Sequence, residues 1–375
     1  MLTTHPSIML GSYIWDENRL PRDEFDIRCA HLQSAMSHNG WAATLIYGDA
    51  REHAALAFFT NFIPRMRWAL ALIPATGEPR LLASMSSRDM PAMRSMTWIS
   101  DVRSAWEWEH FNEFCARLPV GGKIATIATH SMTPMLLRQV EESVRIKLDL
   151  VSADSVSDEA RSAQRPREIA LIRSAAKIAR SAGSVMLASW REGSDMESAA
   201  LESERAAREL AVQDVRTLLS RDGGRTLEPF SARFDNRPSQ RTAYVAIKSM
   251  GYWAEIFCSC GHSSSSRSRA VGGLDVLLAG FVPGESVRGL VEKVTAITGP
   301  QQPFLSRNLG SRIGLSLCDG DPLSHSSDAR VSTNTVYALR VGAVDQQGGA
   351  IASAMVHIRN NGQLEVMLRS NPEER

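Results

Sequence analysis

The spacing of apolar positions divides the first half of the chain into alternating helices and strands. Residues 23–39 carry apolar side chains at helical spacing, and Gly40 follows them as glycine often follows the last turn of a helix. Residues 43–47 then form a short apolar run that is typical of a buried strand. Further strands are predicted over residues 68–73, 79–83 and 123–128. Strands that alternate with helices in this way predict an α/β domain with a mostly parallel or mixed sheet.

The second half follows a different pattern, in which two helices precede a strand-rich segment. Residues 152–165 are small and polar, so we interpret them as a linker and end the first domain at residue 155. Pro166 opens a long helix, because proline is favoured in a first turn, and Ser194 with Glu197 predicts a capping box for the next helix. Strands are predicted over residues 243–247, 252–259, 336–341 and 355–358, with a loop at 262–269 and a helix over 270–281 between them. Residues 156–375 are therefore predicted to form an α+β domain.

The composition indicates which kinds of partner the protein is expected to bind and in which cellular compartment it is expected to lie. The chain is 43% hydrophobic and 22% charged, and its net charge of +1 predicts no general attraction to nucleic acid or to a membrane surface. Its five cysteines form no regular framework, and such an odd count favours a reducing compartment. The N-terminal residues lack the pattern of a secretory signal, and no apolar run is long enough to span a membrane. We therefore expect a cytoplasmic protein.

Seven segments of the chain are informative because of the order in which they occur. They are FDIRCAHLQSAMSHNGWAATLIYG, FFTNFIPRMRWALALIPATGEPRLL, QRPREIALIRSAAKIA, MGYWAEIF, LGSRIGL, NTVYALRVGA and GAIASAMVHIRNNG. In this order and spacing they resemble segments of the creatinase/prolidase/aminopeptidase P family, over nearly the whole chain. The resemblance implies an α/β creatinase-like N-terminal domain over residues 1–155 and an α+β pita-bread domain of the catalytic type over residues 156–375.

The resemblance also implies five metal-ligand positions, because the metal-dependent members of the family bind two divalent ions through two Asp, one His and two Glu residues. The matching residues of this chain are Tyr244, Glu255, Ser311, Arg340 and Ser353. Of these, only Glu255 could still bind a metal, and Arg340 would place a permanent cation where a dication binds. We therefore expect no metal at this site, and we expect no other cofactor.

Creatinase, a metal-free member of the family, relies on a histidine that precedes the first Asp position. This chain has no histidine between Ser131 and Gly261, so that acid–base group is missing whatever the alignment. The chain is therefore expected to be neither a standard metallopeptidase nor a standard creatinase.

The substituted positions allow two interpretations of Glu255. Glu255 and Tyr244 are expected on adjacent strands, where a buried glutamate beside a tyrosine donor could act as a general acid–base. In the other interpretation Glu255 pairs with Arg340 and fills the space that the metals left. Arg340, the third residue of the predicted catalytic set, and Arg312 are also candidates for binding a carboxylate or phosphate by forked hydrogen bonds.

The segment TNFIPRMR is predicted to take part in substrate binding. In creatinase-like proteins the N-terminal domain of one subunit reaches the pocket of the other, so the resemblance implies a homodimer with a shared pocket. Phe62, Arg65 and Arg67 are the matching candidates, because two arginines beside an apolar anchor suit an anionic ligand. The alternative is that these side chains only support their own domain.

Cys258, Cys260 and His262 alternate along one predicted strand and would share one of its faces. Zinc accepts such ligands, but the usual two-residue gap between cysteines and a fourth ligand are missing. A thiol nucleophile at Cys258 or Cys260 would also lack an identifiable activating partner. A new metal site is therefore the least favoured interpretation, and the role of these residues stays open.

Together these points predict a metal-independent creatinase-like enzyme that acts on a small, anionic, amino-acid-like substrate. The resemblance implies hydrolysis of a C–N bond or a related lyase step. Charged residues at the pocket positions favour this function over an inert relic, since buried unpaired charge is costly. The alternative is a catalytically inactive pita-bread homologue that binds a small molecule or has a regulatory role.

Overall fold

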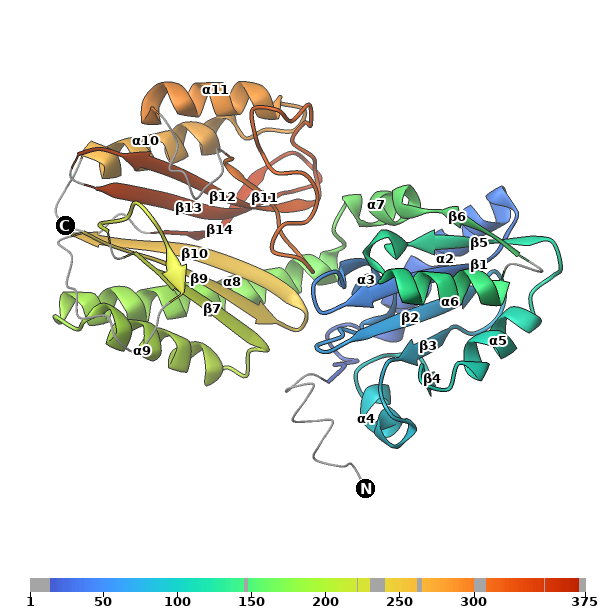
Figure 1. Ribbon diagram of the computed structural model, residues 1–375. Coiled ribbons are helices and arrows are strands. Elements are labelled where there is room, and N and C mark those ends of the chain that lie inside the picture. Colours follow the sequence, from blue (N-terminus) through green and yellow to red (C-terminus); the bar gives the residue numbers. More distant parts are fainter. Residues whose placement is uncertain are drawn as a thin grey trace. The chain divides into compact units, whose positions relative to one another are not determined.

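The computed structural model describes residues 14–144, 148–220, 222–229, 240–261, 265–299, 308–346 and 348–370, and the chain divides into two compact units (Figure 1). The first unit is Met1–Ser162 and the second is Ala163–Arg375. The predicted boundary after residue 155 falls inside helix α7 (Asp154–Ser162), in the stretch that the sequence presented as a linker. Helix α7 packs against α2 (Arg22–Asn39), and Asp154 accepts a hydrogen bond of 2.7 Å from the backbone N–H of Ala128. These contacts join the polar stretch to the first unit.

One six-stranded mixed sheet forms the centre of the first unit, with strand order β4-β3-β2-β1-β5-β6. The strands are β1 (Trp41–Asp49), β2 (Trp68–Pro74), β3 (Arg80–Ala83), β4 (Asp101–Ser104), β5 (Gly122–Ile127) and β6 (Leu148–Ser152). Strand β1 pairs antiparallel with β2 and parallel with β5, which confirms the predicted mixed sheet. Gly40 ends α2 with a left-handed φ of 68°, a conformation that glycine adopts without steric cost.

Helices cover this sheet through apolar side chains. Helices α5 (Glu109–Ala116) and α6 (Pro134–Val144) contribute Phe111 and Val140 to a buried cluster that also contains Leu45 of β1. Helices α2 and α3 (Ala54–Thr60) also pack on β1. The remaining helical elements are α4 (Met90–Arg94) and two short 3-10 turns, η1 (Ser87–Asp89) and η2 (Thr129–Ser131). In the described part of the chain, no helix combines the length and the apolar character that crossing a membrane requires.

The second unit contains two antiparallel sheets, with strand orders β10-β9-β7-β8 and β11-β12-β13-β14. The first sheet consists of β7 (Asp214–Leu219), β8 (Glu228–Pro229), β9 (Gln240–Ser249) and β10 (Tyr252–Gly261). The second consists of β11 (Gly310–Arg312), β12 (Thr335–Val344), β13 (Gly349–Ile358) and β14 (Leu364–Arg369). The helices of the unit are α8 (Pro166–Arg191), α9 (Met196–Arg208), α10 (Ser265–Gly280) and α11 (Val287–Thr298).

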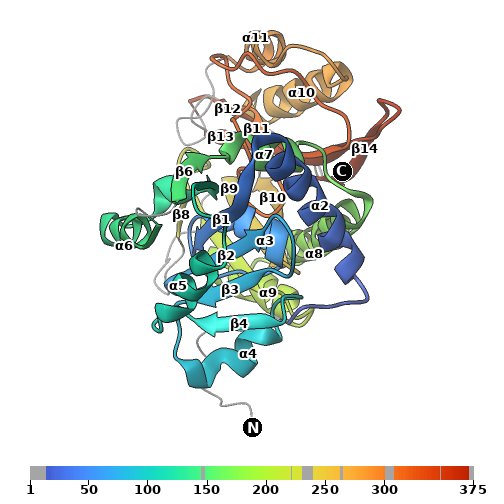
Figure 2. The same cartoon turned by 90° about the vertical axis from the view of Figure 1, so that its right-hand side faces the viewer.

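Helices α10 and α11 cover the outer face of the second sheet (Figure 1; Figure 2). Leu339 of β12 and Ala354 of β13 belong to the apolar cluster formed with these helices, together with Leu274 of α10. Because successive strand residues point to opposite faces, Arg340 and Ser353 lie on the inner face of this sheet.

Helix α8 covers the outer face of the first sheet and leaves the other face of β10 for the site. The helix approaches closely at Gly183, where an added Cβ would lie 3.1 Å from both Cys258 and Ile256. Alternation along the strand then places Glu255 and Phe257 on the opposite, inner face of β10. Strand β10 is at the edge of its sheet, and the two sheets meet where it approaches β13.

Other element boundaries differ from the sequence prediction by a few residues. Helix α9 is capped by Asp195, which accepts a hydrogen bond of 2.8 Å from the backbone N–H of Ser198, and not by Ser194. Helix α10 begins at Ser265, inside the predicted loop, whose first residues lie outside the described part of the chain. Gly362 has a φ of 80° in the turn of the hairpin between β13 and β14, a conformation that favours glycine.

An ionic cluster around Glu365 of β14 joins the second sheet to α8. The carboxylate accepts two hydrogen bonds of 3.1 Å from Arg173 and one of 3.2 Å from Arg359, and it contacts His357 at 3.4 Å. Burial alone would raise the pKa of Glu365, but the hydrogen bonds from Arg173 and His357 outweigh it and lower the pKa to about 2.

This cluster makes part of the stability depend on pH. A carboxyl group with a lowered pKa in the folded state stabilises the fold above its unfolded pKa, and the contribution is lost as pH falls through the folded value. We expect Glu365→Gln to reduce the unfolding free energy at pH 7 by about 2 kcal/mol, and the deficit to shrink as pH falls from about 4.5 to about 2. Urea titrations at several pH values measure this, with the exposed Glu192→Gln as the control. A deficit that stays constant down to pH 3 would show that Glu365 is not the titrating group.

Candidate functional site

Five neighbouring strands bring together the positions that the family resemblance selected. Tyr244, Glu255, Ser311, Arg340 and Ser353 lie on β9, β10, β11, β12 and β13, respectively. Tyr244 is paired with Phe257 across β9 and β10, and Arg340 is paired with Ser353 across β12 and β13. The hydroxyl of Ser353 accepts a hydrogen bond of 3.0 Å from the backbone N–H of Phe257, which links the two sheets. The structure therefore gathers the predicted positions into one site on the inner faces of both sheets.

Glu255 is the centre of this site. Its side chain is 4% exposed, and the Tyr244 hydroxyl donates a hydrogen bond of 2.8 Å to its Oε2. The Nη1 atom of Arg340 lies 3.6 Å from the other carboxylate oxygen. Both expected contacts of Glu255 are thus present, the tyrosine donor on the adjacent strand and the pair with Arg340.

The surroundings of Tyr244 and Arg340 determine the charge that each of these two side chains carries. Burial and the negative charge of Glu255 raise the pKa of Tyr244 well above its usual value, so the phenol stays neutral and can donate a hydrogen bond. Burial acts to lower the pKa of Arg340, but the charge of Glu255 outweighs this effect and raises it. The site therefore holds a neutral phenol, one carboxylate and one permanent cation.

These side chains do not form a ligand set for paired divalent ions. Ser311 directs its hydroxyl to the carbonyl oxygen of Leu317 at 3.5 Å, and Ser353 is engaged by the backbone of β10. A paired-ion site needs several carboxylates and tolerates no guanidinium among them, because the cation repels the ions. Within the described residues, no three His, Cys, Asp or Glu side chains are grouped so as to hold a metal ion.

A glycine sets the position of β11 at the edge of the site. Gly310 has a φ of 124°, and a Cβ there would lie 1.9 Å from the carbonyl oxygen of Ala338 on β12. Only glycine allows this approach, which brings Ser311 and Arg312 beside β12. Arg312 is half-buried, and its carbonyl oxygen accepts a hydrogen bond of 2.9 Å from the N–H of Asp319.

Cys318 lies near the site, although no sequence pattern selected it. Cys318 lies close enough to Arg340 and Tyr244 to contribute to the raised pKa of each of these two side chains. The residue lies in an irregular segment after β11, where periodicity predicts neither the course of the chain nor its contacts. The one sequence signal that could have indicated Cys318 is its position three residues after the LGSRIGL motif.

The cysteines of β10 have the surroundings of core residues. Cys258 is buried, its Sγ lies 3.7 Å from the carbonyl oxygen of Gly183, and burial raises the pKa of its thiol to about 12. A metal ligand must be a thiolate, so this thiol is poorly suited to bind zinc. Cys260 is half-buried, and His262 lies outside the described residues.

The predicted substrate residues of the first unit divide into two kinds. Phe62 is 2% exposed and is buried within its own unit, and its part in substrate binding stays a prediction. Arg65 and Arg67 are exposed, and the guanidinium of Arg67 lies 5.0 Å from the centre of the Trp106 ring. Contact with a ligand stays a prediction for the two arginines.

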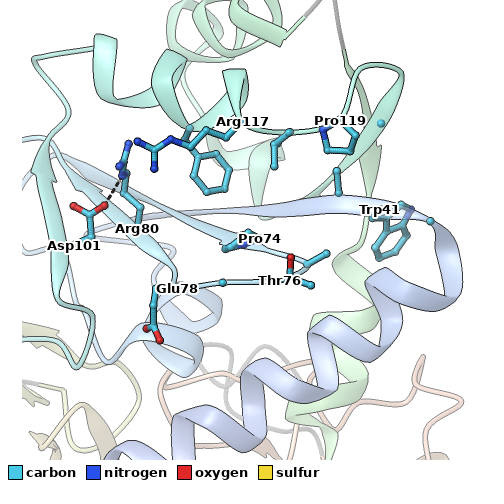
Figure 3. Close-up of a pocket in the computed structure, with 15 residues that line it drawn as sticks. Trp41, Pro74, Thr76, Glu78, Arg80, Asp101, Arg117 and Pro119 are labelled. Atoms are coloured by element: carbon cyan, nitrogen blue, oxygen red, sulfur yellow. Dashed lines mark hydrogen bonds and ion pairs between the residues drawn. The ribbon is translucent and has the colours of Figure 1, made fainter.

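The first unit also has a pocket of about 530 Å³ that contains none of the predicted site residues. Figure 3 shows Arg80, Asp101 and Arg117 at one end of it and Trp41 at the other. Arg80 pairs with Asp101 at 2.7 Å. The most buried charge of this pocket is therefore already satisfied within the unit.

Solved structures similar to this chain belong to one fold. No protein-family model matches the sequence, and no curated protein matches it. The prolidase from Pyrococcus horikoshii OT3 has a TM-score of 0.78 at 14% identity, with 92% of this chain and 99% of that chain covered. The X-Pro aminopeptidase from Thermotoga maritima MSB8 has a TM-score of 0.74 at 17% identity, with 91% and 98% covered.

A third similar structure is not named as a peptidase. The N-terminal domain of the FACT complex subunit SPT16 from Cicer arietinum has a TM-score of 0.66 at 13% identity, with 92% and 96% covered. The chain therefore has the two-domain, pita-bread fold of prolidases and X-Pro aminopeptidases, which confirms the predicted fold. At these identities the likeness concerns the fold, and the activity must be argued from the site.

The buried contact between Arg340 and Glu255 leads to a prediction about the stability of the protein. Removal of one partner of a buried pair leaves an uncompensated charge and typically costs about 3–5 kcal/mol. We expect Arg340→Ala to destabilise by such an amount, and Arg340→Ala with Glu255→Ala to cost much less than the sum of the single variants. Denaturant unfolding of the four proteins measures the coupling, and Arg340→Ala combined with Arg191→Ala, an exposed position, is the additive control. Additive losses for Arg340 and Glu255 would refute an energetic coupling.

Proposed function

We propose that this chain is a metal-independent enzyme that binds a small, anionic, amino-acid-like molecule and cleaves a C–N bond in it by hydrolysis or elimination. The contacts of Glu255 with Arg340 and with Tyr244, at positions that hold metal ligands in the resembled family, carry this proposal. The guanidinium supplies the positive charge that metal ions supply in a metallopeptidase site, but it serves by forked hydrogen bonds to an anion. The likeness in fold to prolidases supports hydrolytic chemistry as the reaction class.

Arg340 has donors left for a ligand after its contact with Glu255. Its Nε atom is buried and has no hydrogen-bond partner among the described residues, and its side chain is 17% exposed. A carboxylate that approached this face could accept from Nε and a neighbouring nitrogen in the planar geometry that arginine favours. Arg312, on the adjacent strand β11, is proposed as a second cationic contact.

Glu255 is the proposed acid–base and Tyr244 the proposed neutral donor. The 3.6 Å contact with Arg340 engages one carboxylate oxygen of Glu255. An anionic substrate would compete for the guanidinium and weaken that contact. Glu255 could then take a proton during addition of water or elimination, while Tyr244 holds the developing charge through its hydroxyl group.

A second candidate function is binding or regulation without catalysis. Both carboxylate oxygens of Glu255 are engaged, which suits a structural charge pair. The likeness to a domain of a complex subunit shows that structures with this fold are not all named as peptidases. In this function Arg340 still binds the anion, and no bond is broken.

The partner and compartment are also proposed. We propose a homodimer in which Arg65 and Arg67 of one subunit contribute to the ligand site of the other, since both are exposed cations. We propose a cytoplasmic location, because all five cysteines are free thiols. No role with nucleic acid or membranes is proposed, given the net charge of +1.

Thermal shift with matched ligands tests the anion site. We expect glycyl-proline and creatine to raise the melting temperature, while glycyl-prolinamide and creatinine, which lack the carboxylate, do not. The carboxylate-dependent shift should disappear in Arg340→Met and weaken in Arg65→Ala and Arg67→Ala. Without ligand, the melting temperatures of Arg65→Ala and Arg67→Ala should stay close to that of the wild type. Shifts of equal size for the charged and uncharged compounds would contradict the anion site.

Release of amine from the same compounds separates the two functions. Turnover that persists in excess EDTA and is not increased by added Mn²⁺ supports the metal-independent enzyme. Carboxylate-dependent stabilisation without any amine release supports the binding function. Turnover that requires a divalent ion would contradict metal independence.

A further inference from the structure

The pocket of the first unit lies where helix α5 ends and its cover of the sheet stops. Phe114 of α5 and Leu118, just after it, line the pocket and also pack in the apolar cluster of this unit. Leu82 of β3 belongs to the same cluster, so Arg80, two residues before it on the strand, lies on the same face of the sheet. The pocket therefore continues the apolar core outward, and its volume of about 530 Å³ is typical of a site for a small molecule.

Arg80 is a buried cation at one end of this pocket. It is 6% exposed, its Nε donates a hydrogen bond of 2.7 Å to Asp101, and its Nη1 donates one of 2.7 Å to the carbonyl oxygen of His110. The carboxylate of Glu113 lies 3.8 Å from Nη1. These contacts fix the guanidinium and balance its charge. The Nη2 atom, however, makes no hydrogen bond within the described residues and is not buried, so one donor of a fixed cation stays available to a ligand.

Arg117 is the second cation at this end. It is exposed, and Figure 3 shows its side chain extending toward Arg80. The acidic side chains that line the pocket are engaged with other arginines. Asp101 pairs with Arg80, and Glu78 pairs with Arg22 at 3.1 Å while its carboxylate points away from Arg117 in Figure 3. Among the described residues, the positive charge of Arg117 is therefore the one in this pocket that no acidic side chain balances.

The other end of the pocket is apolar. Trp41 is half-buried there beside Pro119, as Figure 3 shows, and Pro74 lies between the two ends. Rings of this kind offer flat surfaces to a planar ligand. Strands β3 and β1, which carry Arg80 and Trp41, are separated by β2 alone. At a spacing of about 4.8 Å between neighbouring strands, the cationic and the aromatic end are therefore about 10 Å apart across the sheet.

We propose that this pocket binds a small organic carboxylate with a flat apolar body about 10 Å long. Arg117 and the Nη2 atom of Arg80 hold the carboxylate from two sides, and Trp41 and Pro119 contact the body. One unbalanced cation suits a carboxylate, which carries a single negative charge, better than a phosphate monoester, which carries about −1.5 to −2. The inference uses no residue of the second unit, so it does not depend on the proposed function.

Calorimetric titration of the intact protein with three matched probes tests the pocket. Indole-3-butyrate has the carboxylate and the flat body, indole-3-butyramide lacks the charge, and butyrate lacks the ring. We expect indole-3-butyrate to bind at least about tenfold more tightly than either of the others, because a hydrogen bond to a charged group typically has an effect of this size. Equal affinity for indole-3-butyramide or for butyrate would overturn the proposal, and so would the absence of indole-3-butyrate binding at about 1 mM.

Variants of exposed residues locate the binding. Arg117→Met should weaken the binding of indole-3-butyrate at least about tenfold and leave that of indole-3-butyramide unchanged. Arg138→Met is the control, because it removes the same charge from an exposed position of α6 that does not line the pocket. Arg80 is kept intact, since its loss would break the contacts with Asp101 and His110.

A second variant fills the pocket without touching its charges. Thr76 is exposed and lines the pocket, so Thr76→Trp should weaken the binding of indole-3-butyrate while the melting temperature stays close to that of the wild type. Full affinity for indole-3-butyrate in both Arg117→Met and Thr76→Trp would show that the compound binds elsewhere, for example beside Arg340, and would overturn the proposal.

Discussion

The contact between Arg340 and Glu255 is the constraint on which the account of this protein depends. It places a permanent cation 3.6 Å from a carboxylate that is 4% exposed, on strands that carry metal ligands in proteins of the resembled family. A buried charge of either sign is costly alone, so each member requires the other or a ligand in its place. The same cation that excludes divalent ions can bind an anion. In the proposed function, the pair replaces a site for metals by a site for small anionic molecules.

The fold brings Arg340 and Glu255 together through the alternation of side chains along the strands and through the close packing of two pairs of elements. Gly183 allows α8 to pack on one face of β10, which leaves Glu255 on the other, and Gly310 allows β11 to approach β12. Helices α10 and α11 cover the outer face of β12 and β13, so Arg340 is left on the inner face. The chemistry of the site therefore follows from packing on the outer faces of the sheets. The chain can resemble both prolidases and a domain of a complex subunit in fold, because the fold determines the positions of residues and not their types.

The sequence predicted the parts of this architecture that periodicity and order encode. The strands that carry Tyr244 and Glu255 could be predicted from their apolar runs, and the meeting of both residues follows from antiparallel pairing across the tight Met250–Gly251 turn. Arg340 could be placed from its strand and the family resemblance. Cys318 could not, because its segment is positioned by hydrogen bonds to β11 and has no period. Helix α7 was missed since its small polar residues are also typical of linkers.

Metal content of the purified protein tests the central claim most directly. The protein is produced in medium supplemented with manganese, cobalt and zinc, purified without chelator, dialysed, and measured by elemental analysis. Because Arg340 occupies a former ligand position beside the only remaining carboxylate among the five, the account predicts far less than one divalent ion per chain. Retention of about two ions per chain, as a paired-metal hydrolase requires, would contradict it.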